Sequence, residues 1–422
     1  MYKKEVLKNG LRLCTHDMKG RESLSVGLWV GAGGRFEDDK LKGAAHFLEH
    51  ILFKGSKRYS CSEIKEQIEG VGGSLNAFTA EENTCYYAKF PSKHVVRVLD
   101  ILADMVFYPS ISKSDVERER GVILEEIKMY HDLPQYFVLE LLDGLVWPGH
   151  ALGKNLAGTQ ESISKITHTD LKGFHKKYYS PQNIVVSACG CLDHNQVFSL
   201  IEKKSKGIFN QEQPGFIGAD NVQIGPKVKF YRKQIEQMHL AMGMFGYEYD
   251  HKDKYALNLL SIILGGNMSS RLFNEVREKR GLAYSIGSCT KSLKDTGMFM
   301  IRAGVDNLNI VDAASLIIKE LGKIKKKGVV KDEFVRTKDY LLGQIVMGLE
   351  DTLEHMLWMG ESLSSRNRIR RLQEVKQAVQ KIKMADIKRV AQDVLRESHY
   401  NLAIVGPLND QQEGQLKGLL KV

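Results

Sequence analysis

Apolar positions along the chain follow two periods, one typical of strands and the other typical of helices. Short apolar runs such as residues 24–30 and 184–190 read as strands, and longer amphipathic stretches between them read as helices. Each half of the chain gives a strand, a helix, further strands, several helices and a final strand. We therefore predict an α+β fold with two structurally related domains, each a largely antiparallel sheet covered by helices on one face.

An internal repeat supports this division into two related domains. The segment LSVGLWVGAGGRFED resembles HLAMGMFGYEYDH and aligns Gly27 with Gly243, 216 positions later. The segment PQNIVVSACGCLD resembles SHYNLAIVGPLND and aligns Asn183 with Asn401, 218 positions later. Self-similarity at a constant offset indicates one supersecondary plan that is used twice.

The stretch between the two repeats has the composition of a linker. Residues 210–227 are rich in Gly, Pro, Asn and Gln and show no helical period. We predict one domain over residues 1–209 and a second over residues 228–422, joined by this segment.

Composition and charge narrow the possible functions. The chain is 43% hydrophobic and 27% charged, which is typical of a globular protein. Six cysteines without a CxxC pair do not predict a disulfide framework. The net charge is +10, but the basic run at residues 366–371 lacks any nucleic-acid-binding signature, so we expect no nucleic-acid partner. No run is apolar enough to span a membrane and the first residues do not read as a signal peptide, so we expect a cytoplasmic protein without a membrane partner.

The segment GAAHFLEHILFKGS contains His46, Glu49 and His50 in the order H-x-x-E-H. In a helix the two histidines lie on adjacent turns of one face, which suits two nitrogen ligands of a tetrahedral Zn²⁺. Glu49 falls beside them, where a carboxylate can act on a water molecule without ligating the metal. The alternative is a pair of core histidines with a charged neighbour, an arrangement that is costly unless another group compensates the charge.

A catalytic zinc needs a third protein ligand, and the stretch SKSDVERERGVILEEIKMYHDLP offers two candidates. It is predicted to be helical until Pro134. Glu119 and Glu126 share one edge of its apolar face, whereas Glu125 points to the opposite side. Seven residues span about 10 Å of helix, so one glutamate would ligate and the other would orient a histidine. The spacing does not choose between them, and both could also be ordinary half-exposed helix residues.

With these two helices in view, the chain resembles the inverted-motif zinc metallopeptidases of the pitrilysin and mitochondrial processing peptidase family, in their short single-unit form. The resemblance covers nearly the whole chain. It rests on the ordered segments LKNGLRL, GAGGRFED, GAAHFLEHILFKGS, GVGGSLNAFTAEENTCYY, ERERGVILEEI, YYSPQNIVV and SSRLFNEVREKRGLAYSIGS.

In the first half of the chain, the resemblance makes Glu126 the third ligand and Glu119 the carboxylate behind a histidine. It also places Asn76 and Ala77 on an edge strand that pairs with an extended substrate. Without the family, Asn76 could equally be a turn residue.

In the second half, Arg277 and Tyr284 match family residues that hold the substrate and stabilise the oxyanion. The residues alone would fit an ordinary surface arginine and a half-buried tyrosine. Asn258, Ser261 and Ile262 stand near the places of the three motif residues, so only the first half is expected to bind zinc.

The resemblance implies a zinc metalloendopeptidase with Glu49, Tyr284 and Arg277 as its catalytic residues and one Zn²⁺ per chain. Extended, unstructured peptides are the expected substrates, cleaved inside a chamber formed by a homodimer. Two alternatives stay open: a noncatalytic scaffold subunit, and the catalytic subunit of a heterodimer with a related chain.

Overall fold

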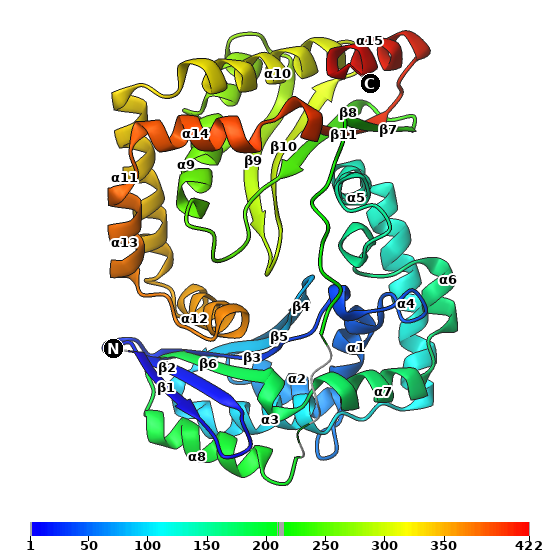
Figure 1. The fold of residues 1–422 in the computed structure, drawn as a ribbon. Coiled ribbons are helices and arrows are strands. Elements are labelled where there is room, and N and C mark those ends of the chain that lie inside the picture. Colours follow the sequence, from blue (N-terminus) through cyan, green and yellow to red (C-terminus); the bar gives the residue numbers. More distant parts are fainter. Residues whose placement is uncertain (1, 209, 211–214, 422) are drawn as a thin grey trace. The chain divides into compact units, whose positions relative to one another are not determined.

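A computed structural model describes residues 2–208, 210 and 215–421. The chain forms two compact units (Figure 1). The first spans residues 1–127, 155–217 and 346–370, and the second spans residues 128–154, 218–345 and 371–422. Two helical segments, 128–154 and 346–370, therefore belong to the unit opposite to their half of the sequence.

The first unit is built on a six-stranded sheet in which only the pairing of β2 with β6 is parallel. In spatial order its strands are β1 (Tyr2–Val6), β2 (Arg12–Asp17), β6 (Ile184–Gly190), β3 (Ser23–Val30), β5 (Thr84–Pro91) and β4 (Ser74–Thr79). Strand β4 is at the edge, and the central strands β3 and β6 are buried along nearly their whole length.

The second unit is built on a five-stranded sheet in which only the pairing of β7 with β11 is parallel. In spatial order its strands are β7 (Lys227–Arg232), β11 (Asn401–Gly406), β8 (Gln237–Phe245), β10 (Gly297–Asp306) and β9 (Ala283–Ser292). The order β7-β11-β8-β10-β9 repeats the order β2-β6-β3-β5-β4, with the parallel pair at the same end. The predicted α+β fold with an internal repeat is confirmed.

The strand registers align the repeat more closely than the sequence does. Gly31 N–H donates to the carbonyl of Asn183 at 3.0 Å, and Gly243 pairs with Asn401. Because Asn183 and Asn401 correspond in the repeat, the counterpart of Gly243 is Gly31, and the predicted match with Gly27 is four residues out of register. A shift of four keeps every side chain on the same face of a strand, so alternation alone could not reveal it.

Helices cover both faces of each sheet, which corrects the expectation of one covered face. In the first unit, α1 (Ala44–Leu52), α2 (Cys61–Glu69), α3 (Val95–Phe107) and α8 (His194–Ser205) pack on one face. Helix α12 (Thr352–Arg366) packs on β3 and β6 from the other face (Figure 1). The near-continuous burial of the central strands is what two covered faces require.

In the second unit, α5 (Pro134–Val146) packs against β8 and β11 and contributes to a separate core cluster. Helix α9 (Lys254–Gly265) packs against the edge strand β9. The remaining helices are α4 (Lys113–Asp132), α6 (Gln160–Lys165), α7 (His168–Tyr178), α10 (Ile310–Lys327), α11 (Lys331–Gly348), α13 (Leu372–Lys381), α14 (Met384–Val394) and α15 (Asp410–Leu420).

Most of the predicted linker has no regular structure where it is described. Residues 211–214 lie outside the described residues, residues 215–226 form neither helix nor strand, and β7 begins at Lys227. Among the described helices, none has both the length and the apolar character needed to cross a membrane.

Candidate metal centre

Helix α1, which carries the H-x-x-E-H motif, is preceded by a position that suits only glycine. Gly43 has a φ of +94°, and a Cβ there would lie 2.7 Å from the carbonyl oxygen of Ala157. No side chain of Gly43 can cap the helix, and the buried carboxylate of Glu37 does so instead. Its oxygens accept hydrogen bonds from the N–H groups of Gly43 at 3.0 Å and Ala45 at 2.7 Å. A carboxylate at a helix N-terminus also complements the helix dipole.

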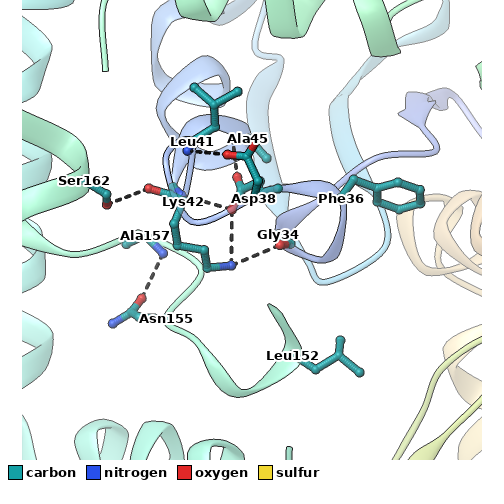
Figure 2. Close-up of polar contacts among 12 residues, drawn as sticks. Gly34, Phe36, Asp38, Leu41, Lys42, Ala45, Leu152, Asn155, Ala157 and Ser162 are labelled. Atoms are coloured by element: carbon teal, nitrogen blue, oxygen red, sulfur yellow. Dashed lines mark hydrogen bonds and ion pairs between the residues drawn. The ribbon is translucent and has the colours of Figure 1, made fainter. Parts of the chain in front are cut away.

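A lysine neutralises this buried cap. Lys42 Nζ lies 3.2 Å from the Glu37 carboxylate and donates to the carbonyl of Gly34 at 3.0 Å (Figure 2). Ser162 in α6 donates to the carbonyl of Lys42 at 2.7 Å. Burial raises the pKa of Glu37, and Lys42 opposes that shift. The first turn of α1 is therefore fixed by polar contacts before the motif begins.

The motif residues project from α1 toward α4. Phe47, Leu48 and Ile51 are fully buried in the main core of the first unit, which leaves His46, Glu49 and His50 on the half-buried side of the helix. The side chains of His46 and His50 are 14% and 21% exposed. They are accessible enough to receive an ion and buried enough to exclude most bulk water.

Glu126 of α4 meets both histidines. Its Oε1 lies 3.8 Å from Nε2 of His46, and its Oε2 lies 3.3 Å from Nε2 of His50. One ligand atom from each of the three residues falls within 4.8 Å of the others, and among the described residues this is the one group of three or more His, Cys, Asp or Glu that does so. Ligand atoms about 2.0–2.1 Å from a tetrahedral zinc lie roughly 3.4 Å apart, so this donor set fits Zn²⁺.

Glu119 stands behind the cluster. Its Oε1 lies 2.9 Å from Nδ1 of His50, and its Oε2 lies 2.5 Å from Nζ of Lys54. An acceptor on Nδ1 keeps a proton there and leaves Nε2 free to ligate a metal. The structure therefore places Glu126 with the ligand atoms and Glu119 behind His50, which are the positions that the resemblance implied.

The two histidines of the cluster have different electrostatic surroundings. Burial and the neighbouring His50 lower the pKa of His46. Burial also acts to lower the pKa of His50, but hydrogen bonds with Glu119 and Glu126 outweigh it and raise that pKa to about 9. A hydrogen bond with His50 lowers the pKa of Glu126. The two imidazoles thus do not share the positive charge equally, since His50 is held between two carboxylates.

Glu49 contacts the edge strand β4. Its Oε2 accepts a hydrogen bond from Oγ1 of Thr79 at 2.5 Å. Burial raises the pKa of Glu49, and the bond from Thr79 opposes that shift. A half-buried carboxylate with a raised pKa beside a metal-ligand cluster has the properties of a general base.

Asn76 and Ala77 lie in the middle of β4, at the free edge of the first sheet. Asn76 is exposed, and its side-chain oxygen accepts a hydrogen bond from the N–H of Ala77 at 2.8 Å. An edge strand offers main-chain groups to an added strand. The structure supplies the edge, while substrate pairing there stays a prediction.

Arg277 and Tyr284 lie together in the second unit. Arg277 belongs to a π-helical segment, Phe273–Glu278, and its guanidinium carbon lies 4.7 Å from the ring centre of Phe273 and 5.8 Å from that of Tyr284. Tyr284 is 74% exposed at the start of β9. Short π-helical segments are frequent at functional sites. The role of Arg277 and Tyr284 toward a substrate stays a prediction.

Helix α9 occupies the place of α1 in the second unit without its ligands. Asn258 accepts a hydrogen bond from Thr290 at 3.0 Å, and the hydroxyl of Ser261 lies 3.3 Å from that of Ser288. The side chains that stand in the places of His46 and Glu49 thus make contacts with the edge strand.

The sequence did not identify two residues that contact the carboxylates beside the cluster, Glu119 and Glu49. Lys54, the partner of Glu119, follows His50 by four positions, and this helical spacing could have indicated a shared face. Thr79 shares the face of Ala77 by strand alternation, but no pattern in the sequence pairs it with Glu49.

Two protein-family models match successive parts of the chain. The model described as Insulinase (Peptidase family M16) matches residues 12–160, and the model described as Peptidase M16 inactive domain matches residues 165–341. The first match contains the histidine cluster, and the second contains the α9 repeat that lacks it.

Two relatives match over almost their full length. The chain is 36% identical to an uncharacterized zinc protease of Streptomyces coelicolor, covering 98% of this chain and 91% of that protein. It is 33% identical to the uncharacterized zinc protease YmxG of Bacillus subtilis, covering 96% and 98%. A solved protease from Helicobacter pylori has the same fold, with a TM-score of 0.92 at 24% identity over 96% of this chain and 99% of that chain.

Proposed function

Because the chain belongs to peptidase family M16, we propose that it is a zinc metalloendopeptidase that hydrolyses extended, unstructured peptides. The observation that carries the proposal is the convergence of His46, His50 and Glu126. The carboxylate of Glu49 lies directly before His50 on the helix that carries both histidines. Two imidazoles and one carboxylate suit zinc better than they suit magnesium or calcium.

The side chains have distinct roles in this proposal. Zinc, when bound, would act as a Lewis acid on the scissile carbonyl and the attacking water. Glu49 accepts a proton from that water and later delivers it to the leaving amine, so the carboxylate is unchanged after one cycle. Glu119 orients His50 through Nδ1. We assign to Arg277 and Tyr284 the holding of the substrate and the stabilisation of the developing oxyanion.

The edge strand β4 supports the choice of substrate class. A peptide that pairs with Asn76 and Ala77 must be extended, so folded proteins are excluded unless they unfold locally. The Ala77 N–H is bonded to the Asn76 side chain in this structure, and an incoming strand would replace that bond.

Peptide cleavage tests the proposal directly. We would incubate the purified chain, Glu49→Gln and the control Glu125→Gln with a mixture of unstructured peptides, and identify the products by mass spectrometry. Glu125 is a suitable control because it is exposed on the same helix as Glu126. We expect cleavage by the wild type and by Glu125→Gln, no cleavage by Glu49→Gln, and loss of cleavage with a chelator. Cleavage by Glu49→Gln at the wild-type rate would refute the mechanism.

We further propose that the active form is a homodimer in the cytoplasm. The chain matches relatives over nearly their full length, which supports a short form of the family. In the family that the chain resembles, the site is enclosed between two such units. Sedimentation analysis at assay concentrations would test this. A monomer that cleaves peptides at the full rate would refute the homodimer, and activity that requires a second, related chain would favour a heterodimer.

A scaffold role is the second candidate, because one matched family model describes an inactive domain. That match covers residues 165–341, which do not include the histidine cluster, and the other family model matches the cluster itself, which favours an enzyme. Failure of the purified chain to bind zinc would favour the scaffold.

A further inference from the structure

We propose that Thr79 positions the catalytic base, so that the strand that pairs with the substrate also sets the orientation of Glu49. This inference rests on the proposed peptidase function. The Thr79 hydroxyl donates to Oε2 of Glu49 at 2.5 Å, which leaves Oε1 as the oxygen that can accept the proton of the attacking water. Thr79 keeps its own proton throughout and acts only through Glu49.

Thr79 is the last residue of β4, two positions after Ala77, and backbone contacts of the following turn fix its position. The turn that follows is closed by a hydrogen bond from Ala80 N–H to the carbonyl of Asn83 at 2.8 Å. The carbonyl of Ala80 accepts from Gly34 N–H at 3.2 Å. A Cβ on Gly33 would lie only 2.1 Å from that same carbonyl oxygen, so the turn and the segment before α1 are in close contact.

A buried ion pair strengthens this connection. Arg35 N–H donates to the carbonyl of Glu81 at 2.8 Å, and its guanidinium lies 2.7 Å from the carboxylate of Glu82. Both charged side chains are almost fully buried. Two residues after Arg35, Glu37 caps α1. The same short segment therefore fixes the end of β4 and the start of the helix that carries Glu49, which is the kind of support that a preorganised base requires.

The second unit contains a related contact, and it defines the competing explanation. The strand registers place Ser288 in the position of Thr79, because Thr79 pairs with Thr84 and Ser288 pairs with Ile301 in the corresponding strands. Ser288 donates to the carbonyl of Ser261, the counterpart of Glu49, at 2.7 Å. A hydroxyl at this edge position could thus serve only to attach the helix to the strand. In the first unit, however, its acceptor is the carboxylate itself.

Three variants separate the two roles. Thr79→Val keeps the shape and removes the hydroxyl, Thr79→Ser keeps the hydroxyl, and Thr84→Val makes the same change at the paired position of β5. Thr84 donates to the carbonyl of Ala32 at 3.0 Å, away from the base. All variants would be compared for bound zinc, melting temperature, kcat and KM on one peptide that the wild type cleaves.

For Thr79→Val we expect kcat to fall about 10- to 100-fold with KM changed less than about threefold, because loss of a residue that orients a reacting group has effects of this size. Thr79→Ser should recover kcat to within about threefold, and Thr84→Val should leave kcat unchanged even if its melting temperature falls. Zinc content should equal that of the wild type.

A wild-type kcat for Thr79→Val would overturn the inference while leaving the proposed function intact. Equal losses of stability and kcat in the valine and serine variants would assign Thr79 a purely structural role. A wild-type chain that is inactive both alone and with a related partner chain would overturn both proposals.

Discussion

The carboxylate of Glu119 bridges the metal-ligand cluster and a lysine, since it lies 2.9 Å from Nδ1 of His50 and 2.5 Å from Nζ of Lys54. Glu119 is only 5% exposed. Nδ1 of His46, in contrast, is buried and has no hydrogen-bond partner among the described residues. Glu119 therefore orients His50 through its Nδ1, and no group among the described residues does the same for His46.

We predict that Glu119→Gln weakens zinc binding about 10- to 100-fold, the usual effect of removing a carboxylate behind a ligating histidine. The amide can still accept from His50, but its NH₂ group would then face Lys54. Competition against a zinc chelator at constant pH measures the affinity. Glu125→Gln is the matched control, and we expect its affinity to stay within about twofold of the wild type. Equal affinities for Glu119→Gln and the wild type would show that His50 needs no orienting acceptor.

His175 should make the protein less stable in acid. Its Nε2 donates to the carbonyl of Val106 at 2.8 Å, and burial lowers its pKa from 6.5 to about 4. Since the folded state binds this proton less readily than the unfolded state, stability is full above pH 6.5 and falls as the pH drops toward 4. The loss is at most about 3 kcal/mol, and below pH 4 it does not grow.

Urea unfolding of metal-free protein between pH 7 and pH 4 would measure this effect. His175→Gln keeps an amide donor for the Val106 carbonyl but does not titrate. We expect its free energy of unfolding to fall less steeply over this range than that of the wild type, whatever its value at pH 7. If the free energy of unfolding fell equally steeply with pH in both proteins, the loss of stability could not be assigned to His175.

The sequence predicted those parts of the site that depend on local periodicity. The H-x-x-E-H spacing puts His46, Glu49 and His50 on one side of a helix, and the seven-residue spacing puts Glu119 and Glu126 on one side of another. Helical periodicity could not show which glutamate ligates the metal, because that choice depends on how far along its axis α4 meets α1. The resemblance and the structure agree on Glu126.

The sequence could not predict contacts that depend on the path of the chain. The exchange of the segments 128–154 and 346–370 between the compact units leaves no local signal, because an amphipathic helix does not specify which sheet it covers. The four-residue error between Gly27 and Gly31 has a similar origin, since strand alternation is unchanged by even shifts. The bond from Thr79 to Glu49 also joins two elements whose packing only the fold determines.

The packing of α12 on the first sheet gives the last prediction. Gly360 faces Trp29, and a Cβ at this position would lie 1.9 Å from the indole Nε1, which donates to the hydroxyl of Ser187 at 2.9 Å. Alanine normally stabilises a helix relative to glycine by about 1 kcal/mol. Here it would force the buried indole or the whole helix to move, and overpacking of this kind typically costs about 1–3 kcal/mol. We therefore expect Gly360→Ala to lower the free energy of unfolding despite its better helix propensity.

Gly343 provides the matched control, because it lies within α11 and a Cβ there would meet no atom within 4 Å. Gly343→Ala should raise the free energy of unfolding by up to about 1 kcal/mol through helix propensity alone. Denaturant unfolding of both variants gives the comparison. If Gly360→Ala were as stabilising as Gly343→Ala, α12 could not lie as close to Trp29 as the structure has it. The tight contact of this exchanged helix with the first sheet would then have to be revised.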